Sequence, residues 1–466
     1  MEKKQKRSLS LNAFVLLLII MLICAVLTWI VPAGSFERVQ DEVTGRMVVV
    51  PGSYATTESS PVGPIQFVTS IFAGFMDAAD IIFFIIFAST YVFLLNKCGA
   101  LHSACGALLN KVGTRDHLII PIFMLFFALG GTTFGMYEEV YALVPAFIVI
   151  AMTLGYDRIV GGAIVFVGVA TGFAAATLNP FTIGVAAGVA EVPLAEPKVL
   201  IFRIVAFIAF MALNITYVMR YAAKIKKDPT KSIMYGIPQE EEKDLMSRDE
   251  VMGMEFTTRH KISMVGFLLL IVILIFGIIK QGWWFQEIAS LFLVFFIVTG
   301  LINGYSANQL GELFIESSKA TIYGALIVGM ARGISVVMAA GGIIDTIVYF
   351  LSNLVSSLPT ALTGIGMLIV QNLINFFIPS GSGQAVVTMP IMAPLADVVG
   401  ISRQMAVMAF QFGDGFSNMF WPTGVATICG FMSISLDQWY KFITKLFIMM
   451  FCLQCIFMVV GVVIGI

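Results

Sequence analysis

The 466-residue chain is 59% hydrophobic and 12% charged, with 27 Lys and Arg residues against 28 Asp and Glu residues. Soluble domains carry roughly a quarter charged residues and about 45–50% apolar ones, so this composition excludes a soluble globular protein. It predicts an all-α polytopic protein whose partner is the lipid bilayer. The apolar residues form continuous runs rather than alternating ones, which excludes a β-barrel, and the balanced charge gives no reason to expect a nucleic-acid partner.

The chain begins with a basic stretch, Lys3 to Arg7, followed by an apolar run at 12–33. This run is close to the ~20 residues that span a bilayer and longer than the ~7–15 residues of a signal-peptide core, so we expect a retained signal-anchor helix. The positive-inside rule places the N-terminus in the cytoplasm. Next come a polar loop at 34–64, an amphipathic stretch at 65–80, a span at 81–97 and an interfacial helix at 98–113.

Two short apolar limbs, 118–130 and 136–153, flank the sequence Gly-Gly-Thr-Thr-Phe-Gly at 130–135. Each limb is shorter than a comfortable span, so residues 118–153 are predicted to form an inward re-entrant hairpin. Irregular backbone at membrane depth is tolerated only inside protein or beside a water-filled cavity. A span at 159–178 is expected to break at Asn179 and Pro180 and to resume at 181–190. A helix at 199–221 returns inside, where the charged segment 222–260 is expected to be a cytoplasmic linker.

The second half is predicted to contain spans at 261–279 and 287–302, an amphipathic stretch at 305–317 and a span at 318–340. An interfacial helix at 341–357 follows. A second pair of short limbs, 360–378 and 385–397, flanks the sequence Pro-Ser-Gly-Ser-Gly-Gln at 379–384, which predicts an outward hairpin over 359–397. A span at 402–420 breaks at 421–424, and the last helix occupies 437–465. The total is nine spans and two hairpins, with the C-terminus outside.

The two halves repeat one plan. Three residues of the first half, Pro145, Gly155 and Arg158, recur at a constant offset of 245 as Pro390, Gly400 and Arg403. The segment 261–286 adds one extra crossing, so the second half enters the membrane from the opposite side. Residues 1–221 and 287–466 are therefore predicted to be inverted-topology repeats, each with one hairpin and one broken helix.

Interrupted helices at matching positions of two repeats are the best sequence indication of a transport site, because half-helix ends present free N–H and C=O groups to a small ion or carboxylate. The four interruptions lie at 131–139, 177–182, 379–384 and 418–424. An alternative is that their Gly and Ser residues only allow close helix packing. The candidate polar residues at these places are Thr132, Thr133, Asn179, Thr182, Ser380, Ser382, Gln384, Asn418 and Thr423.

Ionisable side chains inside membrane segments are costly and are functional candidates by default. Glu138 and Glu139 follow the first interruption, Asp414 lies within the span 402–420, and Arg332 lies within 318–340. Asp414 is the first candidate among them. For Arg332, the alternative is a structural ion pair with one of these acids. For the two glutamates, the alternative is a position at a partly solvated part of the hairpin, without a role in binding. A coupling Na⁺ would fit near Asn179, Asp414 and Asn418, and no other cofactor is expected.

No Walker loop, G-x-S-x-G elbow or H-E-x-x-H motif is present in the sequence, so neither a primary pump nor a hydrolytic enzyme is expected. A membrane-embedded enzyme would need a nucleophile and a base at one depth, and the three histidines are scattered. A channel would more naturally use rings of residues from several subunits. These considerations favour a secondary transporter for a small polar metabolite.

Four stretches resemble the YfcC family, which belongs to a larger group with the anaerobic C4-dicarboxylate carriers and the arginine/ornithine exchangers. They are GTTFGMYEEVYALVPAFI (131–148), GMARGISVVMAAGGIIDTI (329–347), NFFIPSGSGQAVVTMPIMAPLADVVGISRQ (375–404) and FQFGDGFSNMFWPT (410–423). The resemblance covers nearly the whole chain. It implies the fold of the ion transporter superfamily, with a scaffold domain, a transport domain that holds both hairpins, an elevator movement and often a homodimer.

The family does not determine the substrate, but the charged residues within the membrane segments narrow the choice. Three acids, Glu138, Glu139 and Asp414, face a single cation, Arg332. A basic amino acid fits this arrangement, with an acid for its side chain and Arg332 or a helix N-terminus for its α-carboxylate. The alternative is a Na⁺- or H⁺-coupled carrier of C4-dicarboxylates or other carboxylates, in which the acids bind the coupling cation instead.

Overall fold

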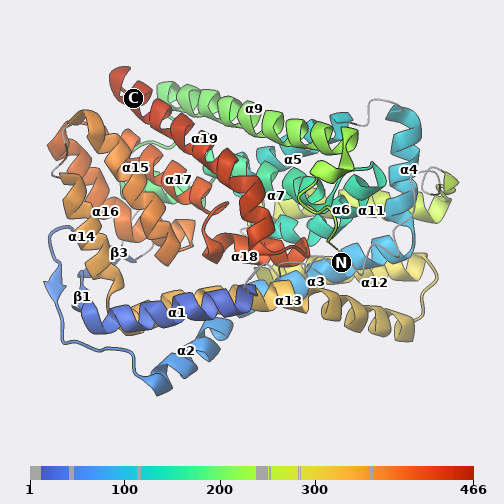
Figure 1. Ribbon diagram of the computed structural model, residues 1–466, viewed down its shortest axis with the longest axis horizontal. Helices are drawn as coiled ribbons and strands as arrows, with labels where there is room; N and C mark the ends of the chain where they lie inside the picture. The colour runs from blue at the N-terminus through green and yellow to red at the C-terminus, as the bar shows by residue number, and fades with distance from the viewer. Residues whose placement is uncertain are drawn as a thin grey trace, which may run out of the picture.

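The computed structural model describes residues 12–466 except 41–46, 113–116, 238–249, 251–252, 282, 284, 357 and 359. Long helices run between the two ends of the molecule that lie left and right in Figure 1. One layer of them contains α1 (Ala13–Ile30), α2 (Pro64–Asp77), α3 (Ala79–Lys97), α12 (Phe285–Ile302) and α13 (Ala307–Ala340). In this layer α13 packs on α1, α2 and α3, and α3 packs on α12. The helix α11 (Thr258–Gln281) packs on α12.

The rest of the chain forms two sets of helices with the same order of elements. The first set comprises the first helix pair, α5 (Ile119–Phe134) and α6 (Val144–Thr153), the broken helix α7 (Arg158–Ala174) and α8 (Ile183–Val189), and α9 (Pro197–Lys227). The second set comprises the second helix pair, α15 (Thr360–Phe377) and α16 (Gly381–Val399), the broken helix α17 (Arg403–Ser417) and α18 (Pro422–Phe431), and α19 (Leu436–Val463).

Equivalent helices of the two sets make equivalent contacts. Both members of the first helix pair pack on α7, and both members of the second pair pack on α17. The turn that leads into each broken helix is also the same. It contains a glycine with positive φ, Gly155 at +80° and Gly400 at +78°. An N-cap side chain follows, Asp157 bonding Val160 N and Ser402 bonding Met405 N.

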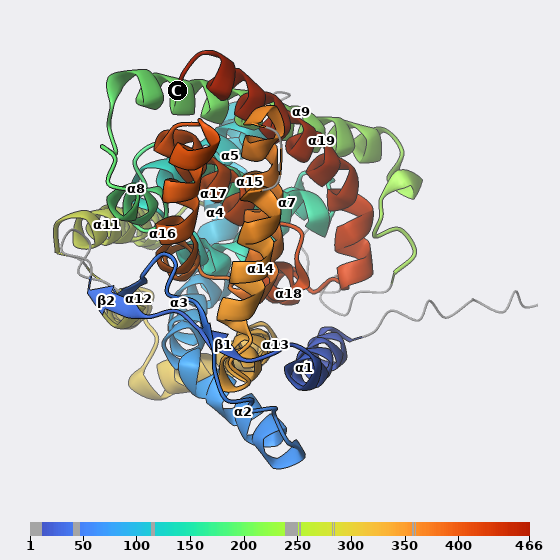
Figure 2. The same ribbon diagram turned by 90° about the vertical axis from the view of Figure 1, so that its left-hand side faces the viewer.

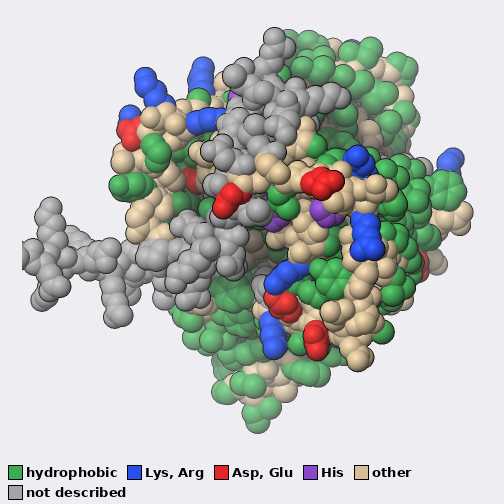
Figure 3. Space-filling view, turned by 90° about the vertical axis from the view of Figure 1, so that its right-hand side faces the viewer, with side chains coloured by type: hydrophobic (Ala, Val, Ile, Leu, Met, Phe, Trp, Pro, Cys, Tyr) green, Lys and Arg blue, Asp and Glu red, His purple; other side chains and the backbone are tan. Residues whose placement is uncertain are grey.

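The two helix pairs lie in opposite halves of the molecule (Figure 1), whereas the short helix α8 of the first set packs on α16 and α17 of the second. In Figure 1 the first helix pair lies on the right and the second on the left. A short helix precedes each pair, α4 (Ala100–Val112) at the right end and α14 (Ile344–Ser356) at the left end. The right end, seen in Figure 3, gathers charged side chains of both signs and histidine. The helix α9 ends on that side with Lys224, Lys226 and Lys227 in its last turn.

Six helices in the described part of the chain are long and apolar enough to cross a bilayer. They are Ala79–Lys97, Pro197–Lys227, Phe285–Ile302, Thr321–Ala340, Gly381–Val399 and Leu436–Val463. The helix α7 is different, because it is buried along its length except at Phe173. A helix that is apolar on all sides and enclosed by protein belongs to the core, and α7 is the central support of the first set.

Four short strands lie in the segment that was expected to be a polar loop. The strands β1 (Gly34–Ser35) and β4 (Ala55–Thr56) pair, as do β2 (Arg38–Gln40) and β3 (Met47–Val49), both antiparallel. A short 3-10 helix, η3 (Pro229–Lys231), follows α9. The protein is thus mostly rather than wholly helical. Figure 2 shows the strands at the end of the molecule that bears α14.

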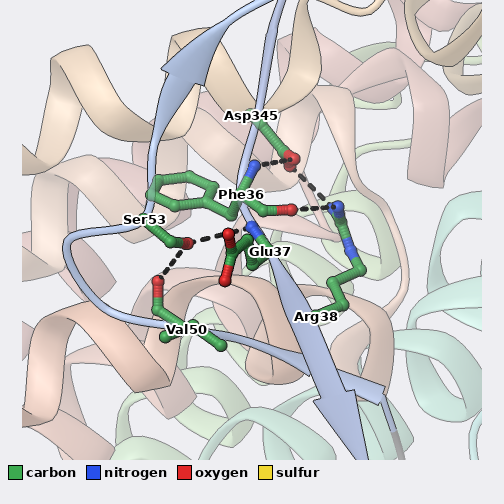
Figure 4. Close-up of polar contacts among 6 residues, drawn as sticks. All are labelled: Phe36, Glu37, Arg38, Val50, Ser53 and Asp345. Carbon is green, nitrogen blue, oxygen red and sulfur yellow. Dashed lines mark hydrogen bonds and ion pairs between the residues drawn. The ribbon is translucent and has the colours of Figure 1, made fainter.

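This strand segment is fastened to α14. Asp345 accepts a hydrogen bond from Phe36 N at 3.0 Å and forms an ion pair with Arg38 at 2.9 Å between Nη2 and Oδ1 (Figure 4). The Tyr54 ring stacks on the Tyr349 ring with centroids 4.1 Å apart. Strand β3 also contacts α16. The segment therefore joins the second helix pair to the helix that precedes it, and Asp345 anchors this junction.

Two expected boundaries differ in the structure. The helix α5 continues through Gly130 to Phe134, so the expected end of the first limb at 130 is wrong. The chain turns at Gly135 to Tyr137, within the expected interruption 131–139, before the 3-10 helix η2 (Glu138–Leu143). Gly131 serves close packing instead, because a Cβ there would lie 2.5 Å from Val169 O on α7. The expected boundary between 305–317 and 318–340 is also wrong, since α13 is one continuous helix that begins at a capping box.

Candidate functional site

The turns of both helix pairs meet the loop that interrupts the first broken helix, residues 175–182, which we call the first break. A Cβ on Gly135 would lie 2.5 Å from Asn179 Oδ1. A Cβ on Gly381 would lie 2.5 Å from Thr182 Cγ2 and 3.1 Å from Asp414 Oδ2. Only glycine permits such close approach. The turn of each helix pair therefore lies against the first break, and the second turn also lies against Asp414 of α17.

Thr132 joins the first helix pair to the first break. Its carbonyl oxygen accepts from the backbone N of Thr177 and of Leu178, each at 3.0 Å. Its hydroxyl donates to Ala175 O at 3.0 Å and accepts from Thr177 N at 3.0 Å. All of these groups are at least nine-tenths buried except Leu178. Thr132 therefore satisfies backbone groups that the interruption of α7 leaves without helical partners.

Asn179 shapes the entry to α8. Its Oδ1 accepts from Phe181 N at 2.8 Å and from Thr182 N at 3.3 Å, which is the local side-chain-to-backbone pattern that asparagine favours in turns. The side chain is fully buried, and its Nδ2 has no hydrogen-bond partner among the described residues. The Thr182 hydroxyl, which is also buried, has none either. Both groups remain able to bind a ligand.

Asp414 is fully buried in the middle of α17. Its Oδ1 accepts from Asn375 Nδ2 of α15 at 2.8 Å, while Oδ2, the oxygen that faces Gly381, has no partner among the described residues. Its backbone oxygen accepts from the side chains of Ser417 and Asn418 at 2.9 and 3.1 Å. A buried carboxylate with one unsatisfied oxygen is costly unless a cation or a donor binds it, so Asp414 is the strongest candidate for contact with a ligand.

Two further charged residues belong to this region. Glu138, at the start of η2, lies within Coulombic range of Arg332 and of Asp414. Arg332 lies in α13 and pairs with Asp77 of α2, with 3.7 Å between Nε and Oδ2. The sequence alternative of an ion pair with Glu138, Glu139 or Asp414 is therefore wrong in its partner, although Arg332 acts electrostatically on Glu138. The site therefore contains more acidic than basic side chains.

Buried amides extend the site along the second helix pair. Gln384 Nε2 donates to the Gln371 carbonyl oxygen at 2.9 Å and to its Oε1 at 2.7 Å. Trp421, in the loop that interrupts the second broken helix, donates its Nε1 to Asn372 O at 2.8 Å. Around these bonds, several buried polar atoms have no partner among the described residues. They are Gln371 Nε2, Asn372 Nδ2, Asn375 Oδ1, Gln384 Oε1 and Thr423 Oγ1.

The remaining sequence candidates lie in less direct positions. Ser380 caps α16 by accepting from Gly383 N at 3.3 Å, and Ser382 is half-buried beside it. Thr133 is exposed and bonds Leu129 O at 2.6 Å. Glu139 accepts from Tyr137 N at 2.8 Å and lines a separate cavity that faces α11. In the described part of the chain, no hydrogen bond or ion pair joins any of these four residues to the Asp414 carboxylate.

The sequence interpretation missed Asn375, Gln371, Asn372 and Asp77. Three of them are amides within the otherwise apolar limb 360–378, and the rule that polar residues in membrane segments are functional candidates could have found them. Asp77 gave no such signal, because it ends an amphipathic helix. Among the described residues, no three His, Cys, Asp or Glu side chains cluster, so the oxygen and amide groups here suit a small cation or an organic ion rather than a transition metal.

The chain is similar to known proteins along nearly its whole length. The model of the DcuC family, described as C4-dicarboxylate anaerobic carrier, matches residues 12–463. An uncharacterized protein of Haemophilus influenzae is 30% identical over 503 residues, covering 99% of this chain and 98% of that protein. The putative basic amino acid antiporter YfcC of Escherichia coli is 30% identical over 482 residues, covering 94% of each chain.

Two solved structures also align. MtrF of Neisseria gonorrhoeae, described as an antimetabolite efflux pump, has 17% identity and a TM-score of 0.44, covering 98% of this chain and 96% of that one. The YdaH transporter of Alcanivorax borkumensis has 13% identity and the same TM-score, covering 98% and 99%.

Proposed function

The chain belongs to the DcuC family of C4-dicarboxylate anaerobic carriers, and from this premise we propose that it is a secondary active exchanger of basic amino acids. Family membership makes it a multi-pass membrane transporter. The substrate is our inference. The observation that carries it is the buried Asp414 carboxylate, whose Oδ2 faces the turn at Gly381 and has no partner in the described part of the chain.

The charge balance supports a cationic substrate. A guanidinium or ammonium group at Asp414 would satisfy the free oxygen with a charge-assisted hydrogen bond, and Glu138 lies within Coulombic range to reinforce it. The α-carboxylate of the same substrate would need donors. Asn179 Nδ2 and Thr182 Oγ1, which have no partner among the described residues, could donate at the first break. The E. coli relative described as a putative basic amino acid antiporter supports the same assignment.

The arrangement of helices supports alternating access by an elevator movement. In this proposal α1–α3 and α11–α13 form the scaffold, while the two helix pairs, the broken helices, α9 and α19 form the transport domain. The helices α4 and α14 connect the two parts at opposite ends of the molecule. The helix pairs would then be re-entrant hairpins that open to opposite compartments, with the N-terminus inside and the C-terminus outside. A homodimer completes the proposal.

A carboxylate carrier coupled to Na⁺ or H⁺ is the second candidate, and the family description favours it. Two amide donors on the second helix pair, Gln371 Nε2 and Asn372 Nδ2, have no partner in the part of the chain that the structure describes and could hold carboxylate oxygens. Asp414, with Asn179 and Asn418 close by, would then bind the coupling cation. Sodium dependence separates the two candidates, because obligatory exchange of one cationic amino acid for another needs no sodium.

Transport by purified protein in proteoliposomes tests the proposal. Vesicles loaded with unlabelled arginine should take up labelled arginine or ornithine without sodium, and empty vesicles should not. Labelled succinate should remain outside. Asp414→Asn should reduce exchange to background while the protein still inserts and purifies as a folded species. Sodium-dependent uptake of succinate, with no exchange of arginine, would overturn the first proposal and support the second.

A further inference from the structure

A cavity of about 240 Å³ separates the first helix pair from α11 and α12. It is lined almost wholly by Phe, Leu, Ile, Val and Met side chains from α5, η2, α11 and α12. Leu270 and Leu274 belong to its α11 wall, together with Phe267 and Ile271, and both leucines are at least nine-tenths buried. An apolar cavity of about 150 Å³ with a similar lining stays dry and binds benzene, so this one has room for a benzene ring and a short chain.

One carboxylate gives the cavity a chemical preference. Glu139 lies on its lining, and the other polar side chain there, Thr133, already donates its hydroxyl to Leu129 O at 2.6 Å. One Glu139 oxygen, Oε2, accepts from Tyr137 N at 2.8 Å, so the acid is fixed in place. A carboxylate in apolar surroundings favours a partner with a protonated amine, because a neutral partner leaves its charge uncompensated.

The cavity opens toward the outer surface of the helices. Phe126 and Leu129 lie on its lining and keep 43% and 47% of their surface exposed, and Thr133 is exposed beside them. An exposed apolar surface on a helix of a multi-pass membrane protein can face lipid, so an occupant can enter from the bilayer without passing the buried site at Asp414. A molecule that partitions into membranes and carries one positive charge satisfies both requirements.

We propose that this cavity binds small arylalkyl amines, with the ring among Phe127, Leu270 and Leu274 and the ammonium group at Glu139. The site is separate from the substrate site, since its lining includes neither Asp414 nor any residue of the first break. Binding does not depend on the transport proposal. Its consequence does: under the elevator movement an occupant would hold the first helix pair against α11 and slow exchange without competing with substrate.

Thermal unfolding in lipid nanodiscs tests binding directly, with 3-phenylpropylamine as the probe and 3-phenylpropan-1-ol as its neutral counterpart. The amine should raise the Tm of the wild-type protein, and the alcohol should raise it less. Glu139→Gln should weaken the binding of the amine about tenfold, as expected for the loss of one charge-assisted hydrogen bond. It should leave the affinity for the alcohol unchanged. Equal weakening of both probes, or of neither, would show that Glu139 does not select the amine.

A filled cavity provides the matched control. Leu274→Trp should occupy the space and remove the response to both probes, whereas Leu269→Trp, on the face of α11 where Leu269 is 50% exposed, should retain it. A Tm response that persists in Leu274→Trp would place binding elsewhere and overturn the proposal. So would the absence of any response in the wild type, which is the result expected if a lipid acyl chain already fills the cavity.

The effect on transport has a separate readout. If exchange of arginine is confirmed, 3-phenylpropylamine should lower its maximal rate without changing KM, and Leu274→Trp should be insensitive. Binding without inhibition would retain the site and remove its coupling to the elevator movement. Inhibition that raises KM would instead show competition at the substrate site and overturn the assignment of a separate site.

Discussion

The contact between Gly381 and the first break leads to a quantitative prediction. A methyl group in Gly381→Ala would lie 2.5 Å from Thr182 Cγ2. Carbon atoms pack at about 3.5–4.0 Å, so the turn must retreat by about 1 Å. A displacement of about 1 Å in a binding site can reduce a rate about 100-fold, and the overpacking itself costs about 1–3 kcal/mol of stability. We therefore expect exchange to fall about 100-fold.

The measurement is the initial rate of substrate exchange in proteoliposomes, with Tm recorded on the same preparations. Gly311→Ala is the matched control, because Gly311 lies in α13 and a Cβ there meets nothing within 4 Å. Its helix should gain up to about 1 kcal/mol, and its exchange rate should be unchanged. A loss of activity with a normal Tm in Gly381→Ala would locate the effect in the site rather than in folding.

A second substitution tests the stated cause. Thr182→Ser removes the clashing methyl and keeps the hydroxyl, and the next Thr182 atom, Cβ, lies at an ordinary 3.6 Å from the added methyl. Asp414 Oδ2 remains at 3.1 Å, so we expect the double variant to recover about tenfold rather than fully. Wild-type exchange by Gly381→Ala would refute the reasoning. So would a double variant no faster than Gly381→Ala when Thr182→Ser alone is active.

Three further outcomes are expected. Asp414→Asn should abolish substrate binding and raise Tm in its absence, because an amide costs less to bury than an unpaired carboxylate; a lowered Tm with binding intact would contradict this. Thr132→Val should lower the stability by about 1–3 kcal/mol, since Ala175 O loses its donor, and denaturant or thermal unfolding against Thr133→Val measures the difference. Asp345→Ala should lower Tm more than Arg38→Ala, because Asp345 is buried and also accepts a hydrogen bond from Phe36 N. Equal losses of Tm in the two variants would contradict this prediction.

The positions of helices could be predicted from the sequence wherever a segment is surrounded by lipid. An apolar segment in a membrane must satisfy its own backbone groups, so hydropathy and flanking polar residues indicate helices such as α19 to within about two residues. The helix α9 was found too, but it continues to Lys227, past the expected end at 221 and into the segment expected to be a linker. The same requirement explains the error at Gly130 to Gly135. Ending the helix at Gly130 would have left backbone groups of the next turn without partners. Gly131 is a glycine because α7 packs directly against it, whereas Gly135 ends the helix with a φ of 78°.

The site was predictable in part. Asp414 could be chosen because a carboxylate within an apolar span has few structural explanations. The structure shows that it is buried and that one of its oxygens has no partner among the residues described. The role of Thr132 could not be read from the sequence, because it depends on the fold that places Ala175 beside α5. Likewise, nothing in the local sequence distinguishes Glu138 from Glu139, although only Glu139 lines the apolar cavity.

The first break has a consequence for how the protein avoids leakage. One short loop contacts the turn of each helix pair, at Asn179 on one side and at Thr182 on the other. Either turn could withdraw while the other keeps the loop in position, but withdrawal of both would leave it unsupported. Under the proposed cycle, the shared loop would allow only one of the two turns to withdraw at a time. The site would then be open to one compartment at a time.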